Sequence, residues 1–320
     1  MKIPFNYTEL ATGADFIGRE DELKSLTGHL ANRHNVAVYG PDGIGKRSLV
    51  NQALVNLKNL YPDLTVYHIN LLNVRTEESF NRIYSETVAA DVYDTQKRIV
   101  IYFEDFQNVL HFDDPDAFLK GLEKRVEGQE AVAYIFSGSK TNGMKYIFRE
   151  KKYFYPQVEY LPISPMNEKV VSDFIVKTFL KVGRVIDKEY VKTFYNISGG
   201  VPYYLWILCS TTFNMTKGFV TPDIKDDALA SIVSIREGQF KSLIDSLSNF
   251  QLSLLRAIYD GVTQFSNKEV IEEYQLNSSA NVFRLKEALK KKEVIYFDED
   301  DIPYIIVPIF RYWLSKYYFI

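Results

Sequence analysis

In the first half of the chain, hydrophobic positions gather in short runs separated by stretches with helical spacing. Nearly every position in these runs is β-branched, aromatic or otherwise apolar, which is typical of strands buried on both faces of a parallel sheet. The runs are residues 36–39, 64–69, 99–103 and 131–136. Between them, apolar side chains recur every three or four positions over residues 49–57 and 116–126. The alternation of strands and helices predicts an α/β layer architecture.

From about residue 164 the spacing becomes mainly helical. The expected helices are residues 166–182, 188–194, 203–213, 239–259, 267–274 and 278–291. Two short apolar runs, 294–297 and 304–307, follow and are separated by the acidic turn 298–301. Three helices and a hairpin make a winged-helix shape. We therefore predict an α/β core over residues 1–163, an all-helical lid over 164–235 and a winged-helix domain over 236–320.

Composition narrows the class of protein. With 320 residues, 46% hydrophobic and 25% charged, the chain can bury real cores and is not disordered. A net charge of −3 argues against a protein that coats nucleic acid. No apolar run approaches the roughly 18 residues of a membrane span, and the first residues lack a secretory signal pattern. We expect a cytoplasmic protein with no membrane partner.

The positions of cysteine and histidine in the sequence indicate neither a nucleophile nor a metal site. The single cysteine, Cys209, has apolar neighbours, so a buried inert thiol is favoured over a nucleophile. The four histidines, His29, His34, His68 and His111, show no metal-ligand spacing.

The sharpest motif is a glycine-rich segment between an expected strand and an expected helix. It matches G-x-x-x-x-G-K, in which backbone amides and a helix N-terminus surround phosphates and the lysine reaches the outer ones. Its residues are Gly40, Pro41, Asp42, Gly43, Ile44, Gly45 and Lys46. The alternative is a plain glycine turn between strand and helix.

The position after the lysine departs from this motif. A Ser or Thr hydroxyl there binds Mg²⁺ in such loops, but here it is Arg47, and Ser48 comes one place late. Ser48 is turned about 100° around the helix, so it does not simply replace the missing ligand. The Arg47 guanidinium either supplies positive charge where Mg²⁺ would sit or turns outward into solvent, and the sequence leaves both open.

Two acids, Glu104 and Asp105, end the third expected strand. Beside a phosphate site, one carboxylate can hold Mg²⁺ while the other takes a proton from the attacking water. We assign Glu104 as the candidate metal ligand and both acids as candidate catalytic groups. The alternative is that they are solvent-exposed acids at a strand end.

With its surroundings, the loop resembles the archaeal-type ATPases of the STAND branch of the AAA+ superfamily, which are relatives of the archaeal origin-recognition initiators. The resemblance spans about residues 14–318 and rests on the order of several weak motifs. These are F-I-G-R-E-D-E-L at 16–23, E-D-F-Q at 104–107, S-G-S at 137–139, S-G-G-V-P-Y-Y-L at 198–205 and V-P-I-F-R-Y-W-L at 307–314.

The resemblance implies a P-loop NTPase core with a five-stranded parallel sheet and nucleotide held between core and lid. It further implies site roles for five residues. Phe16, Gly18 and Arg19 would lie near the adenine, Ser137 would be the polar sensor of the catalytic site, and Pro202 would belong to the lid motif.

Departures from the family cluster where hydrolysis chemistry would occur. The family order at the acid pair is Asp then Glu, so each side chain changes length by one methylene, and a 1 Å misplacement can cost on the order of 10²-fold in rate. Gln157 stands where the family often has an arginine that could face the phosphates. Together with Arg47, these changes predict retained binding of ATP or ADP with slow or absent hydrolysis, and they put Mg²⁺ in doubt.

DNA is the disfavoured partner for the winged-helix region. Residues 236–320 carry 11 Lys and Arg against 12 Asp and Glu, and the expected wing tip is acidic. Phosphate neutralisation supplies most non-specific DNA affinity, so this wing should repel a duplex. Our leading hypothesis is a nucleotide-controlled conformational switch with an unidentified protein partner. The alternatives are a DNA-binding regulator with a vestigial ATPase core and an interaction scaffold that no longer binds nucleotide.

Overall fold

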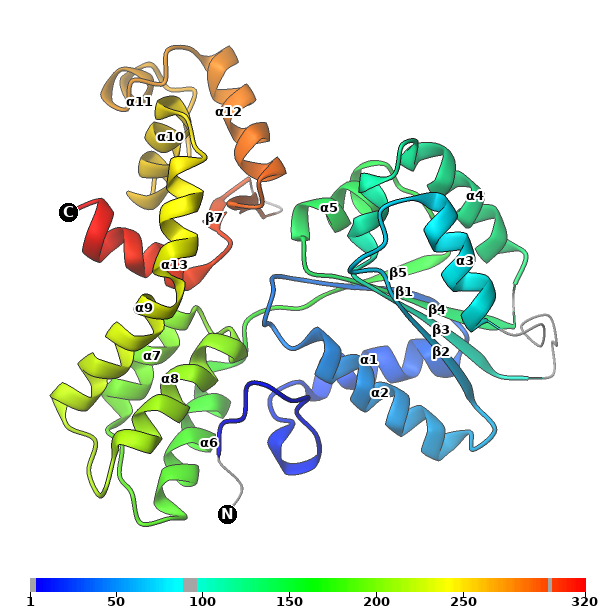
Figure 1. Ribbon diagram of the computed structural model, residues 1–320, viewed down its shortest axis with the longest axis horizontal. Helices are drawn as coiled ribbons and strands as arrows, with labels where there is room; N and C mark the ends of the chain where they lie inside the picture. Colours follow the sequence, from blue (N-terminus) through cyan, green and yellow to red (C-terminus); the bar gives the residue numbers. More distant parts are fainter. Residues whose placement is uncertain (1–3, 89–96, 130, 299–300) are drawn as a thin grey trace. The chain divides into compact units, whose positions relative to one another are not determined.

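The structure is a computed structural model and describes residues 4–88, 97–129, 131–298 and 301–320 (Figure 1). It divides into two compact units. One comprises residues 10–164, and the other comprises residues 165–320 together with the N-terminal segment 4–9. The further division of the second unit into a lid and a winged-helix domain stays a prediction. Helix α9 (Pro222–Asp245) runs without a break across the expected boundary at residue 235.

The unit of residues 10–164 is built on a five-stranded parallel sheet in the order β2-β3-β4-β1-β5. The strands are β1 (Asn35–Tyr39), β2 (Thr65–Asn70), β3 (Ile99–Glu104), β4 (Val132–Gly138) and β5 (Val158–Pro162). The four predicted strands and the parallel five-stranded sheet are confirmed. Hydrophobic patterning did not locate β5, because Glu159 interrupts the apolar positions of this short strand.

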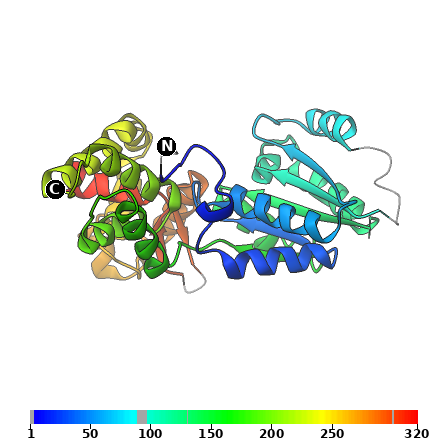
Figure 2. The same ribbon diagram turned by 90° about the horizontal axis from the view of Figure 1, so that it is seen from below.

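Helices cover both faces of this sheet (Figures 1 and 2). One face carries α1 (Glu20–Ala31) and α2 (Lys46–Leu60), and the other carries α3 (Glu77–Thr87), α4 (Pro115–Glu127) and α5 (Thr141–Lys145). Short 3-10 or π turns are η1 (Gly13–Asp15), η3 (Phe106–His111) and η4 (Tyr146–Glu150). Alternate residues of β3 explain the two layers: Phe103 packs in the aromatic core under α3 and α4, while Tyr102 and Glu104 face α2.

The other unit is mainly helical. Its helices are α6 (Glu168–Leu180), α7 (Lys188–Ser198), α8 (Pro202–Met215), α9, α10 (Asn249–Tyr259), α11 (Lys268–Glu273), α12 (Ser279–Lys291) and α13 (Pro308–Trp313), with the π turn η5 (Leu314–Tyr318). The antiparallel hairpin of β6 (Ile295–Phe297) and β7 (Pro303–Ile305) follows α12. The prediction of one helix over 239–259 is wrong: Ser248 begins a new helix, α10, through a reciprocal cap with Gln251.

The prediction of a buried cysteine is confirmed, and aromatic residues form much of the core of this unit. Cys209 is fully buried in α8, and burial raises the pKa of its thiol, as expected for an inert cysteine. Trp313 is buried against Phe240 and Phe310. Phe5 packs among the aromatic rings of α6 and α8, which ties the N-terminal segment to this unit. Among the described residues, no helix is both long and apolar enough to cross a bilayer.

Candidate functional site

The glycine-rich segment forms a tight loop between β1 and α2. Gly43 and Gly45 have φ angles of 75° and 99°, in the left-handed region that favours glycine, and Gly45 is the N-cap of α2. Gly40 is required for space, since an added Cβ would lie 2.9 Å from the main-chain oxygen of Ile163. The sequence therefore folds here into a closed backbone turn at the carboxyl end of the sheet and the amino end of a 15-residue helix.

The amides of this loop are partly engaged by protein carbonyls. The amide of Gly40 donates to the oxygen of Gly138 and that of Ile44 donates to the oxygen of Pro41, both at a long 3.4 Å. Within the described residues, the amides of Gly43, Gly45 and Lys46 have no acceptor. Amides at a helix N-terminus without a protein partner form a favourable environment for an anion.

Lys46 is buried with only 8% of its surface exposed, and its Nζ donates to the main-chain oxygens of Gly40 and Pro41 at 2.9 Å each. Burial lowers its pKa to about 8, although the charges of Asp42, Asp105 and Glu104 act in the opposite direction. The ammonium therefore lies inside the glycine-rich loop, where two carbonyl oxygens accept its hydrogen bonds. A bound anion could accept these hydrogen bonds in their place.

Glu104 is the most heavily engaged acid of the site, because three side chains from two elements, α2 and β2, face it. Nε of Arg47 lies 2.6 Å from Oε1, Nε2 of His68 lies 2.9 Å from Oε2, and Nδ2 of Asn70 donates to Oε2 at 3.2 Å. The Glu104 side chain is 7% exposed, whereas that of Arg47 is 64% exposed. Burial alone would raise the pKa of Glu104, but the hydrogen bond from His68 and the charge of Arg47 outweigh burial and lower it.

Asp105 turns the chain out of β3. Its backbone is left-handed, with φ 55° and ψ 41°, a conformation that Asp tolerates better than most residues. Its carboxylate accepts hydrogen bonds from Gln107 at 3.2 Å and from the hydroxyl of Ser139 at 3.4 Å. The turn thus separates the two acids, so that Glu104 faces α2 while Asp105 lies next to η3 and the end of β4.

Ser137 lies on β4, the strand between the phosphate-loop strand β1 and the acid strand β3. It is buried, and its hydroxyl is 3.0 Å from the hydroxyl of Tyr102 on β3. Tyr102 in turn stacks on His68 with 4.6 Å between ring centres. Strand order therefore brings the predicted sensor serine between the loop and Glu104.

The segment before α1 also reaches the loop. Arg19, the N-cap residue of α1, is buried, and its guanidinium donates to the Ile44 oxygen at 3.0 Å and pairs with Glu22 at 2.8 Å. Gly18 has φ 65° and Phe16 follows η1. Ser48 is turned to this segment, since its hydroxyl accepts the Ala11 amide at 3.0 Å.

Two further predicted positions are Pro202 and Gln157. Pro202 begins α8, in the other compact unit. Gln157 immediately precedes β5, whose first residue, Val158, pairs with Asn35 at the start of β1. Because the strands are parallel, the start of β5 lies at the amino-terminal ends of the strands, whereas the phosphate loop lies at their carboxyl-terminal ends. The expectation that the Gln157 position faces the phosphates is therefore wrong, and its side chain instead donates to Glu127 at 2.8 Å.

Comparisons with solved structures show which fold the chain shares. A Walker-type ATPase of Pyrococcus abyssi superimposes with a TM-score of 0.73 at 15% identity, covering 97% of this chain and 99% of that one. The chain has a P-loop NTPase fold. The ORC2 protein of Aeropyrum pernix, solved as ADPNP-ADP complexes, gives a TM-score of 0.64 at 12% identity, with 95% and 93% covered. The RuvB branch migration motor of Thermotoga maritima gives 0.52 at 13%, with 94% and 96% covered. No protein-family model and no curated protein matches the sequence.

The residues of this P-loop NTPase fold suit a nucleotide polyphosphate better than a magnesium ion. Gly43, Gly45 and Lys46 offer amides without protein acceptors, beside a buried ammonium. Mg²⁺ requires oxygen ligands in octahedral geometry. Arg47 supplies no oxygen, and each carboxylate oxygen of Glu104 already faces a nitrogen donor.

Sequence reasoning missed His68, Asn70 and Tyr102 as members of the site. A signal was present, since His68 and Asn70 are polar, lie two residues apart in a strand and therefore share one face. Their partner on the next strand depends on pairing register, Asn70 opposite Glu104, which the sequence does not give.

Proposed function

We propose that this protein binds ATP or ADP through residues 40–46 and acts as a nucleotide-dependent conformational switch, with slow or absent hydrolysis. The observation that carries the proposal is the buried Lys46 ammonium beside three loop amides that have no acceptor among the described residues. Arg19 braces the same loop through the Ile44 oxygen. The Aeropyrum pernix ORC2 protein, solved with ADPNP and ADP, has the same fold and supports the choice of an adenine nucleotide.

Slow hydrolysis follows from the state of the two acids. A general base must accept a proton, and a carboxylate with a lowered pKa is a weak base. Glu104 has a lowered pKa and accepts from Arg47, His68 and Asn70. Asp105 is held by Gln107 and Ser139. Neither carboxylate is therefore left ready to activate water.

Arg47 would take over part of the role of a metal ion. Its guanidinium already neutralises Glu104 at 2.6 Å, and most of its side chain remains solvent-accessible at the start of α2. A guanidinium placed beside phosphates forms charge-assisted hydrogen bonds without any metal. We therefore propose that nucleotide binding is independent of Mg²⁺, and that Glu104 positions Arg47 rather than holding a metal.

A thermal-shift panel tests nucleotide binding. ATP, ADP and GTP are each added in Mg²⁺ and in EDTA to the wild-type chain and to Lys46→Ala. The proposal predicts that ATP or ADP raises the melting temperature of the wild type equally in both buffers and leaves Lys46→Ala unchanged. An equal shift in Lys46→Ala would contradict binding at the loop, and a shift that disappears in EDTA would contradict the role given to Arg47.

The switch is tested separately by small-angle scattering with and without ATP. If nucleotide controls the arrangement of the two units, the radius of gyration changes on binding in the wild type and stays constant in Lys46→Ala. Binding without any change in the radius of gyration would leave a nucleotide-binding protein and refute the switch.

We further propose that α10, α11, α12 and the β6–β7 hairpin form a winged helix that contacts protein rather than DNA. Three basic side chains of the candidate recognition region are engaged within the unit. Lys286 pairs with Asp301 of the wing at 3.1 Å, Lys290 pairs with Glu287, and Lys292 donates to the Ser246 oxygen. A band shift at ~50 mM salt should show no complex with duplex DNA.

A further inference from the structure

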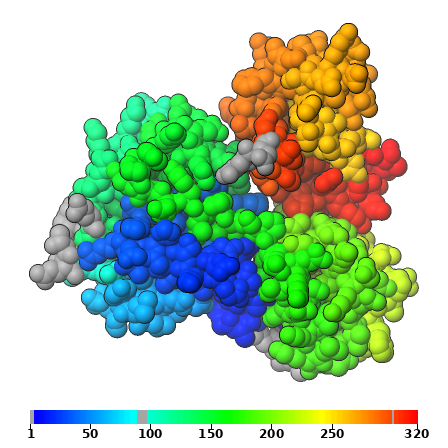
Figure 3. Space-filling model, turned by 180° about the vertical axis from the view of Figure 1, so that it is seen from behind, coloured from blue at the N-terminus to red at the C-terminus, as the bar shows by residue number. Residues whose placement is uncertain are grey.

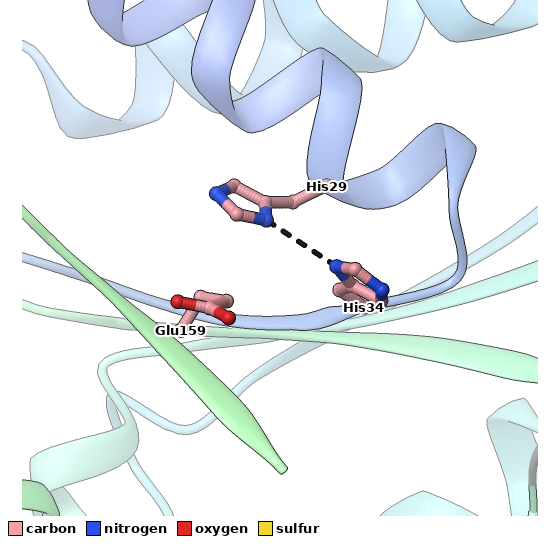
Figure 4. Close-up of side chains that lie close together, drawn as sticks. All are labelled: His29, His34 and Glu159. Carbon is pink, nitrogen blue, oxygen red and sulfur yellow. Dashed lines mark hydrogen bonds between the residues drawn. The ribbon is translucent and has the colours of Figure 1, made fainter. Parts of the chain in front are cut away.

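Two histidines and a glutamate meet at one end of the sheet, away from the phosphate loop. His29 lies in the last turn of α1, His34 lies in the connection that leads into β1, and Glu159 lies on the edge strand β5 (Figure 4). His34 precedes β1, whereas the phosphate loop follows it. The cluster therefore lies at the amino-terminal ends of the parallel strands and the loop at their carboxyl-terminal ends. The nucleotide-site residues described above do not include any of the three.

The fold explains why these side chains converge. The amide of His34 donates to the main-chain oxygen of His29 at 2.9 Å, which bends the chain back at the end of α1. Glu159 pairs with Val36 of β1, and its neighbour Val158 is buried in the core on the face opposite α1. Because side chains alternate along a strand, Glu159 must project to the α1 face, where the two imidazoles lie.

The distances fit a shared metal ion. The Nδ1 atoms of His29 and His34 are 3.5 Å apart, and one ligand atom from each of the three residues lies within 4.8 Å of the others. With metal–nitrogen bonds of about 2.0–2.1 Å, tetrahedral geometry places neighbouring ligand atoms roughly 3.3 Å apart. The two imidazoles are already near that separation, and a carboxylate oxygen of the exposed Glu159 lies within 4.8 Å of both.

The donor set selects the class of metal. Two imidazole nitrogens and one carboxylate oxygen suit Zn²⁺ and its first-row neighbours, whereas Mg²⁺ and Ca²⁺ prefer sites made of oxygens. His34 and Glu159 are exposed and His29 is half-buried, so an ion can enter from solvent and water can complete the coordination. The outer side of α1, drawn in blue, forms part of the surface in Figure 3.

We propose that His29, His34 and Glu159 bind one divalent transition-metal ion of the zinc class. The ion joins the C-terminal end of α1 to the edge strand β5. At the opposite end of the same helix, Arg19 holds the phosphate loop through Ile44, so the ion stabilises a helix that supports the site. This proposal stands without the proposed nucleotide function, because none of its ligands belongs to the phosphate loop.

The test uses tag-free protein in the absence of nucleotide. Co²⁺ is titrated and its visible absorption followed, and Zn²⁺ is then added to displace it. The variants are His34→Ala and Glu159→Gln, and the matched control is His111→Ala, which removes another exposed histidine. Glu159→Gln keeps the size of an exposed side chain, so it preserves the fold. Melting curves in EDTA verify that each variant is folded.

We expect one Co²⁺ per chain with tetrahedral absorption, displaced by Zn²⁺, and a rise in melting temperature with Zn²⁺. Affinity should fall at least ten-fold in His34→Ala and Glu159→Gln and stay unchanged in His111→Ala. Absence of binding by the wild type would overturn the proposal. Equal affinity in the wild type and Glu159→Gln would also overturn it, because the ion would then be held by other groups.

Discussion

The lowered pKa of Lys46 makes nucleotide affinity depend on pH in a defined direction. In the nucleotide-free protein this pKa is about 8, because burial penalises the ammonium. Phosphates placed beside Nζ would favour the charged form and raise the pKa in the complex. Nucleotide therefore binds the protonated lysine, so affinity is full below pH 8 and declines as the pH rises above that value.

The magnitude follows from the protonated fraction. With a pKa of about 8, Lys46 is about 90% protonated at pH 7 and about 10% protonated at pH 9. Affinity should thus fall about ten-fold over this range, which corresponds to about 1.4 kcal/mol. The stability of the nucleotide-free protein should have the opposite dependence on pH. The unfolded lysine keeps its proton up to its ordinary value of 10.5, so Lys46 makes the fold more stable as the pH rises from 8 toward 10.5.

The assay is a titration of ATP in EDTA at pH 7, 8 and 9, followed by calorimetry. Lys46→Arg is the matched control, because arginine keeps its charge throughout this range and its residual affinity should therefore not vary with pH. Equal wild-type affinity at pH 7 and pH 9 would refute the role assigned to the buried ammonium. A decline of the same size in Lys46→Arg would assign the pH dependence to another group.

Three further substitutions test the site and its support. Arg47→Ser restores the hydroxyl of ordinary phosphate loops, so its nucleotide affinity should become Mg²⁺-dependent and fall at least ten-fold in EDTA; titrations with and without metal check this. Gly40→Ala places a methyl group 2.9 Å from the Ile163 oxygen, so it should weaken nucleotide binding while the chain stays folded, as measured by calorimetry and circular dichroism. Phe136→Ala removes a fully buried ring from the aromatic core and should lower the free energy of unfolding by about 3–5 kcal/mol in urea. A loss below about 1 kcal/mol would show that this core tolerates the cavity.

The sequence predicts the sheet well because its signals are local. Apolar runs identify β1 to β4, of which β1, β3 and β4 are buried along nearly their whole length, whereas the edge strand β2 is only partly buried. The glycine spacing identifies the loop before α2. The edge strand β5 has no such run, since Glu159 and Pro162 are exposed and only Val158 is buried. The break between α9 and α10 was also missed, because a capping serine inside an amphipathic pattern changes no hydrophobic spacing.

Contacts within the site depend on features that a single sequence does not encode locally. Strand register places Asn70 opposite Glu104. It also places Gln157 at the end of the strands opposite the phosphate loop. A helix end and an edge strand bring His29, His34 and Glu159 together, although 125 positions separate the last two in the sequence. The sequence predicts that Lys46 and Glu104 belong to the site. It does not predict the burial and the neighbouring side chains that shift their pKa values, because these depend on the fold.

The most direct test of the central claim is calorimetric titration of ADP and ATP into the wild-type chain and Lys46→Ala, with excess EDTA and then with Mg²⁺. The account predicts one nucleotide per wild-type chain, affinities in the two buffers that agree within about three-fold, and no binding heat with Lys46→Ala. Absence of binding by the wild type in both buffers, or binding that requires Mg²⁺, would contradict it.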